Sequence, residues 1–212
     1  MSPFDPSEDE ARAFALACRG DETSPRAMKG LLLRLDYEGR GFVGVLQSSR
    51  YVKGTLADAR RGAEEDARLL SDAGFSVIRT KIEAVASNDG VPRTAMEAER
   101  SPEDRYFEFH LLVDGVNGPI SEGDVASLRA IARDMSARLD RPVPLSYNAL
   151  KPAQRFLNLR ARGCGLDDAM TVVNDLSERI EATDVLRVVK VIGEYICHDD
   201  NRAVDAGWLE PA

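Results

Sequence analysis

Cysteine is scarce in this sequence, and its few copies are scattered. Cys18, Cys164 and Cys197 are the only three among 212 residues, and no two of them form a C-x-x-C pair. Small disulfide-stabilised domains and zinc ribbons need paired or clustered cysteines, so both classes are excluded. The simplest interpretation is a set of reduced thiols in a cytoplasmic protein.

Long apolar runs and an excess of basic charge are also lacking. No stretch approaches the roughly 20 apolar residues of a membrane span, and the opening "MSPFDPSEDE" is acidic rather than signal-like. The net charge of −8 argues against bulk binding to nucleic acid. We therefore expect a soluble protein without a membrane span. A hydrophobic content of 43% is enough for a substantial core.

Hydrophobic periodicity predicts alternating helices and strands along the chain. Ser7, Thr55 and Ser121 each stand three residues before an acidic residue, a pattern typical of helix starts. The predicted helices cover residues 7–19, 55–74, 121–139 and 165–182. The predicted strands cover residues 30–39, 75–86, 105–113, 143–150, 154–163 and 185–199.

The order of these elements predicts the domain organisation. An N-terminal helix and linker over 1–28 precede a single α+β domain over 29–212. Residues 75–90 align with 186–201 at a constant offset, 186 − 75 = 111. We interpret this as an internal duplication that gives two lobes; the alternative is that two β-α-β units look alike by chance. The expected fold is a duplicated or extended ferredoxin-like sandwich, with a mostly antiparallel sheet and helices on one face.

The stretch "RYFEFHLLV" (105–113) contains one of only two histidines. Alternation places Tyr106, Glu108 and His110 on one face of the strand and apolar residues on the other. The other strands split in the same way. The polar residues predicted to share one sheet face are Arg34, Asp36, Arg79, Lys81, Glu83, Glu108, His110, Asn158, Arg160, Lys190 and Glu194.

Three functions fit this charged face, and an ordinary solvated surface is the alternative to all of them. The first is a binding site for a small anionic or nucleotide-like ligand, or for a protein partner. The second is a phosphoesterase-like or nucleotidyl-processing enzyme, with His110 as general acid or base, Glu108 orienting it and Arg160 stabilising negative charge. The third is an interaction protein, including a homodimer formed through edge strands. The ligand-binding candidates are Lys81, Glu83, Asn148, Asn158, Lys190 and Glu194.

Two further motifs give weaker signals. "GRGFVG" (39–44) follows a strand, but no helix opens inside it, so we interpret it as a glycine-rich loop or hairpin rather than a dinucleotide site. Asp199, Asp200 and Asp205 offer oxygen ligands for Mg²⁺ or Ca²⁺; the alternative is a polar turn, and no other cofactor is expected. Trp208 is predicted to dock this tail on the core.

Several blocks of the sequence resemble those of a family of uncharacterised proteins with duplicated ferredoxin-like β-α-β units. They are "GTLADA", "AGFSVIRTKIEA", "YFEFH", "SYNAL", "RFLNLR", "EYICHDDN" and "DAGW", and they cover most of residues 54–208. The resemblance implies a fold and motif positions but no activity. The two-lobed plan is also similar to the two-histidine phosphoesterases, which carry His-x-Thr or His-x-Ser on each lobe. Here leucines follow His110, and the first strand, "LLLRLDYE", has no histidine.

Overall fold

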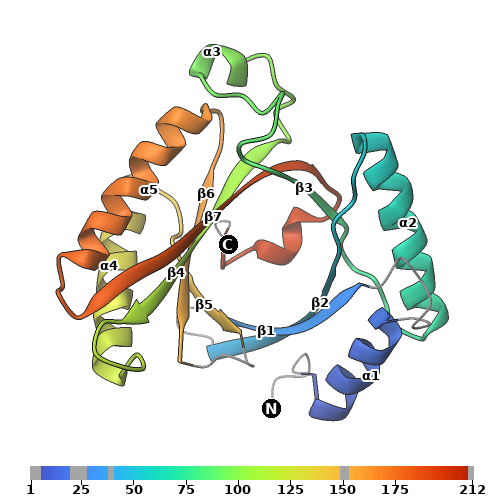
Figure 1. Cartoon of the computed structure of the whole chain (residues 1–212), viewed down its shortest axis with the longest axis horizontal. Helices are drawn as coiled ribbons and strands as arrows, with labels where there is room; N and C mark the ends of the chain where they lie inside the picture. The colour runs from blue at the N-terminus through green and yellow to red at the C-terminus, as the bar shows by residue number, and fades with distance from the viewer. Residues whose placement is uncertain (1–5, 20–27, 38–40, 149–152, 210–212) are drawn as a thin grey trace.

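The computed structural model describes residues 6–19, 28–37, 41–148 and 153–209 (Figure 1). The elements within these residues follow one another as α1 (Glu8–Arg19), β1 (Lys29–Tyr37), β2 (Gly41–Ser49), α2 (Leu56–Asp72), β3 (Lys81–Val85), α3 (Ala95–Ala98), β4 (Tyr106–Gly115), α4 (Glu122–Leu139), β5 (Leu145–Asn148), β6 (Arg155–Ala161), α5 (Leu166–Glu181), β7 (Leu186–Asp199) and the 3₁₀ turn η1 (Arg202–Asp205).

The seven strands form one sheet in the order β2-β1-β5-β6-β4-β7-β3. The strand pairs are antiparallel, so the prediction of an α+β fold with a mostly antiparallel sheet is confirmed. The sheet is strongly curved. Its convex side carries α1, α2, α4 and α5, and its concave side surrounds η1 and the C-terminal segment (Figure 1).

The main core lies on the convex side, between the central strands and helices α4 and α5. Phe107, Phe109 and Leu111 of β4 are at most 1% exposed and belong to the same cluster as Leu128 of α4 and Val173 of α5. Complete burial of a side chain of this size stabilises a fold by about 1.5–3 kcal/mol. The apolar half of the alternation in β4 therefore fixes which face of the sheet the helices cover, and it leaves the polar half on the concave side.

A second, smaller core joins α1 and α2 to the β1–β2 half of the sheet. Phe14, Cys18, Met28 and Leu70 are its buried members, and Phe14 meets Phe75 edge to face with ring centroids 5.2 Å apart. Glycine at position 30 of the chain allows α1 to approach β1 closely. A Cβ there would lie 3.1 Å from the Cα of Ala15. The N-terminal helix is thus packed on the sheet.

The predicted helix starts are confirmed. Thr55 and Ser121 cap α2 and α4 through reciprocal bonds with Asp58 and Asp124, and Ser7 bonds Glu10 in the same way. A further capping box, from Thr94 to Glu97, begins α3, a short helix in the segment between the strands predicted over 75–86 and 105–113. Each box satisfies backbone N–H groups that the first helical turn leaves without partners.

The structure corrects three details of the predicted strands. Only Lys81–Val85 of the strand predicted over 75–86 joins the sheet, because Thr80 donates its backbone N–H to Asp200 of the tail instead. Residues 41–49, which were not among the predicted strands, form β2; β2 pairs with β1 as a hairpin, one of the two interpretations of "GRGFVG". In β1, Leu33 packs against Trp208 and Leu209, so the apolar alternate of this strand faces the concave side.

The two segments aligned as a repeat lie side by side, because β3 pairs directly with β7. No helix within the described residues is long and apolar enough to cross a membrane.

Candidate functional site

The register of three neighbouring strands places the candidate residues. β4 lies between β6 and β7, and Glu108 stands opposite Arg160 on one side and opposite Glu194 on the other. Two residues along β4, His110 stands opposite Asn158. Directly opposed residues of an antiparallel pair project to the same face. These five side chains therefore gather on the concave side, where β3 adds Lys81 and Glu83.

A buried ion-pair network occupies one part of this face; it consists of Arg79, Arg160, Asp199 and Asp205. Arg79 makes two bonds of 2.9 and 2.6 Å to Asp199 and two of 2.8 and 2.9 Å to Asp205. Arg160 Nη2 lies 2.5 Å from Asp205 Oδ2. The Arg160 side chain is 3% exposed and that of Asp205 5%. Asp205 thereby ties the C-terminal segment to β6.

Tyr106 reinforces this network from β4. Its hydroxyl donates a short hydrogen bond to Asp199, and the guanidinium groups of Arg160 and Arg162 lie 4.4 and 4.5 Å from its ring centroid. Burial raises the pKa of the Tyr106 hydroxyl, so it stays protonated as a donor. For Asp199, burial acts to raise the pKa, but the hydrogen bonds from Arg79 and Tyr106 outweigh it and lower the pKa.

Glu108 connects the network to the rest of the face. Its side chain is 1% exposed; Oε1 lies 2.5 Å from Arg160 Nη2, and Oε2 lies 2.6 Å from Lys81 Nζ. Burial alone would raise the pKa of Glu108, but the charges of Lys81 and Arg160 outweigh it and lower the pKa to about 2. Glu108 is consequently an anion throughout the neutral range.

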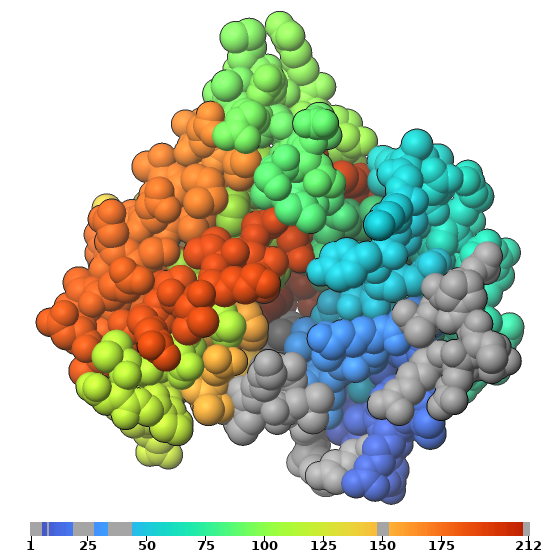
Figure 2. All heavy atoms as spheres, viewed as in Figure 1, coloured from blue at the N-terminus to red at the C-terminus, as the bar shows by residue number. Residues whose placement is uncertain are grey.

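Four other residues are reachable from solvent, and we call Lys81, Glu83, His110 and Glu194 the open cluster. Their side chains are 21–30% exposed. Lys81 Nζ lies 2.9 Å from Glu83 Oε1, and His110 Nε2 lies 3.4 Å from Glu194 Oε2. The space-filling view shows a narrow recess near the centre of the molecule, bordered on one side by β7 and on the other by β2 (Figure 2).

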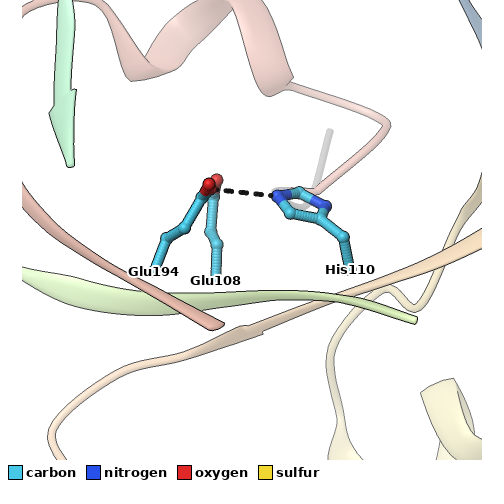
Figure 3. A group of neighbouring side chains, drawn as sticks. All are labelled: Glu108, His110 and Glu194. Atoms are coloured by element: carbon cyan, nitrogen blue, oxygen red, sulfur yellow. Dashed lines mark ion pairs between the residues drawn. The ribbon is translucent and has the colours of Figure 1, made fainter. Parts of the chain in front are cut away.

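The orientation of His110 follows from Asn158, which is 2% exposed. The amide nitrogen of Asn158 donates to Pro144 O at 3.0 Å and to Ser146 Oγ at 3.1 Å. Its oxygen is therefore the atom that meets His110 Nδ1 at 2.7 Å, and it must accept, so Nδ1 carries a hydrogen. The second ring nitrogen, Nε2, is left pointing toward Glu194 (Figure 3).

The titration of the open cluster reflects its mixed charges. Burial disfavours the charged ring of His110, but the hydrogen bond to Glu194 and the charge of Glu108 outweigh this and raise its pKa. Burial likewise opposes charge on Lys81, yet Glu108 and Glu83 raise its pKa. The pKa of Glu83 is raised by burial, and that of Glu194 is lowered because the bond from His110 outweighs burial. The two carboxyl groups thus differ in acidity.

The other residues predicted for the site differ in their exposure to solvent and in their partners. Arg160 is buried against carboxylates of the chain, so it does not meet solvent. Lys190 is exposed on β7, and no ion pair within the described residues reaches it. The side chains of Asn148, Arg34 and Asp36 lie outside the described residues. Asp199 and Asp205 lie together, but the oxygen atoms of both accept bonds from Arg79; Asp200 is exposed and accepts from Thr80.

Asp205 was not among the residues that alternation predicted for this face. Asp205 lies in a 3₁₀ turn, where the alternation used for strands gives no information. The signal that pointed to it was Trp208, whose predicted docking is confirmed: it is 9% exposed and packs with Leu33 and Val45. Because Trp208 holds the C-terminal segment on the concave side of the sheet, Asp205, three residues earlier, lies there too.

Comparison with family models, with curated proteins and with solved structures finds no match to this chain.

Proposed function

We propose that the open cluster is the binding site of a small ligand. The observation that carries this proposal is the convergence of Lys81, Glu83, His110 and Glu194 from three adjacent strands, each partly exposed to solvent. Beneath them, Glu108 and Asn158 are buried and held by hydrogen bonds from the chain. A rigid second layer of this kind holds the reachable groups in place before a ligand arrives.

The charges of the open cluster favour a ligand with a positive or hydrogen-bond-donating group. Two acidic residues, Glu83 and Glu194, stand beside Lys81 and His110, and the buried Glu108 carboxylate adds a third negative charge. Arg79 and Arg160, the guanidinium groups that an anionic ligand would use, already bind Asp199, Asp205 and Glu108. These pairs favour a cationic ligand over the anionic or nucleotide-like ligand expected from the sequence.

A thermal-shift screen tests the binding proposal and the charge of the ligand together. The panel contains small organic cations such as polyamines and amino sugars, and anions such as nucleotides and phosphorylated metabolites. We expect stabilisation by a subset of the cations, reduced in Glu83→Gln and Glu194→Gln. Glu64→Gln, the same change on an exposed position of α2, is the control. Stabilisation by anions alone overturns the charge assignment, and no stabilisation by either class contradicts binding.

A second candidate is an enzyme in which His110 transfers a proton. The observation in its favour is the geometry of the ring, with Nδ1–H held by Asn158 and Nε2 directed to the solvent-reachable side. Lys81 rather than Arg160 is then the cation that reaches a substrate, because Arg160 is buried. Turnover of linear or cyclic phosphoesters should disappear in His110→Ala. Turnover that survives in that variant rules out the role.

Two further proposals concern the whole chain. The outer edges of β2 and β3, the first and last strands of the sheet, suit pairing with a second copy, and light scattering at high protein concentration tests for the dimer.

An internal duplication of ferredoxin-like units would account for the order α2–β3 and α5–β7, and for the presence of the aligned Glu83 and Glu194 on one face.

A further inference from the structure

We infer that Glu108, His110 and Glu194 form a binding site for a divalent transition-metal ion. This inference rests on the proposed function and names one cation, held by two members of the open cluster, His110 and Glu194, together with the Glu108 carboxylate beneath them. The three residues each offer a ligand atom, and these atoms lie within 4.8 Å of one another. Figure 3 shows the two carboxyl groups side by side, facing the edge of the imidazole ring.

The sheet sets this arrangement. Glu108 and Glu194 are directly opposed on β4 and β7, and His110 is two residues from Glu108 along the same strand and face. Ligands held by paired strands keep their separation without help from a loop. The site therefore does not need to be assembled from mobile segments before an ion binds.

The histidine is oriented as a metal ligand requires. A ligating imidazole normally donates its other N–H to an oxygen, which fixes the tautomer and directs the free nitrogen at the ion. Here Asn158 supplies that oxygen, and its own amide is held by Pro144 and Ser146. Nε2 consequently points toward Glu194 Oε2, 3.4 Å away, and a carboxylate oxygen of Glu108 lies within 4.8 Å of both ligand atoms. This buried hydrogen-bond chain separates the site from a mere group of acidic residues.

The donor set indicates the kind of ion. One imidazole nitrogen and two carboxylate oxygens suit Zn²⁺, Mn²⁺, Fe²⁺ or Co²⁺ better than the all-oxygen preference of Ca²⁺ and Mg²⁺. Three protein ligands leave coordination positions free on the solvent side, where the side chains of His110 and Glu194 are 24% and 26% exposed.

Lys81 competes with the metal ion for the carboxylate of Glu108. Its ammonium lies 2.6 Å from Glu108 Oε2, the carboxylate oxygen of Glu108 that Arg160 does not bind. Lys81 also contacts Glu83 at 2.9 Å and is 21% exposed, so it has a second carboxylate to bind when a metal takes its place on Glu108. Lys81→Met should therefore bind the metal more tightly than the wild type.

The presence of only two histidines makes a direct test possible on the wild-type protein. His198 pairs with Ile82, and its Nδ1 lies 3.4 Å from Arg60 of α2, on the convex side. Chelator-treated protein is titrated with Co²⁺ and Mn²⁺ while the histidine ring signals are followed by NMR. We expect saturable binding of one ion per chain, with the His110 signals shifted or broadened well before those of His198.

Variants then assign the ligands by calorimetry with Zn²⁺. Affinity should fall by about tenfold or more in Glu194→Gln and in His110→Gln, and it should be unchanged in the matched control His198→Gln. Absence of saturable binding to the wild type, or equal effects at both histidines, overturns the metal site. If organic cations still stabilise the protein through Glu83 and Glu194 while no metal binds, the metal inference fails and the proposed function stands. If neither binds, both fail.

Discussion

The buried ion-pair network and the open cluster lie on the same concave face and are built from the same residue types, yet they differ in how far their charges are satisfied. Arg160 and Asp205 each contact at least two oppositely charged groups, and their side chains are at most 5% exposed. In the open cluster, the carboxylates of Glu83 and Glu194 each have one ionic partner and partial access to solvent.

Charge on the polar side of a strand therefore does not by itself indicate a binding site. A buried charge with saturated partners is a structural device, and removing one partner is costly because the other is left uncompensated. A charge with spare hydrogen-bonding capacity and access to solvent is free to bind a ligand. Glu108 links the two groups, because it binds Arg160 of the network and Lys81 of the open cluster.

The largest expected effect comes from breaking the buried network. Asp205→Ala removes one carboxylate partner from Arg160 and one from Arg79, so the free energy of unfolding should fall by about 3 kcal/mol. Urea denaturation measures the change. Asp72→Ala, an exposed position at the end of α2, should stay within about 0.5 kcal/mol of the wild type. Equal effects of the two substitutions would show that the network contributes nothing to stability.

The second largest effect is expected from acid, which protonates Glu108, the residue that links the network to the open cluster. The pKa of Glu108 is about 2 in the folded protein and 4.5 ordinarily. A lowered folded-state pKa gives stability that is complete above the ordinary pKa and lost as the pH falls toward 2. The loss is on the order of 3 kcal/mol. Stability measured from about pH 6 to 2 should fall less steeply in Glu108→Gln; parallel profiles would contradict the assignment.

A smaller effect of opposite sign is expected at His110. Its raised pKa gives stability that is complete below the ordinary value of about 6.5 and is lost as the pH rises through the folded-state pKa. Because the side chain is 24% exposed, the contribution should stay below about 1 kcal/mol. NMR titration should place the His110 midpoint above the ordinary value. A midpoint below it would mean that burial, not Glu194, dominates.

The smallest effect should come from Lys190, which belongs neither to the buried ion-pair network nor to the open cluster. It is exposed on β7 opposite Leu112. Lys190→Ala should change the free energy of unfolding by less than about 0.5 kcal/mol, and the response to cations should match that of the wild type. A weakened response in this variant would extend the open cluster along β7 beyond Glu194.

Sequence alternation was sufficient to place the residues of β4, β6 and β7, because these strands have one apolar face and one polar face. Phe109 and Leu111 go under the helices, and Glu108 and His110 take the concave side. It failed for β1, where Leu33 faces inward. Both alternates of "LLLRL" carry leucine, so the pattern gave no reliable choice, and the deciding contact, Trp208, is 175 residues away (208 − 33).

The sequence did not predict which charged residues belong to the buried ion-pair network and which to the open cluster. Arg160 and Lys81 are both basic residues on the polar side of their strands, and the position of the tail makes one buried and the other open. Asp205 reaches Arg160 across 45 residues of sequence, from a segment without regular strand pattern. Contacts of that kind depend on how the chain folds back, and local periodicity does not encode them.

The position of residues 199–209 inside the curve of the sheet has a consequence for biosynthesis. The β1–β2 hairpin leaves the ribosome early, but Trp208, which covers Leu33 and Val45, is made 175 residues after Leu33 (208 − 33). At about 5–20 residues per second, the apolar inner side of this hairpin waits roughly 10–35 s for its cover. During that interval the nascent chain presents an uncovered strand pair, a form to which chaperones and neighbouring nascent chains bind.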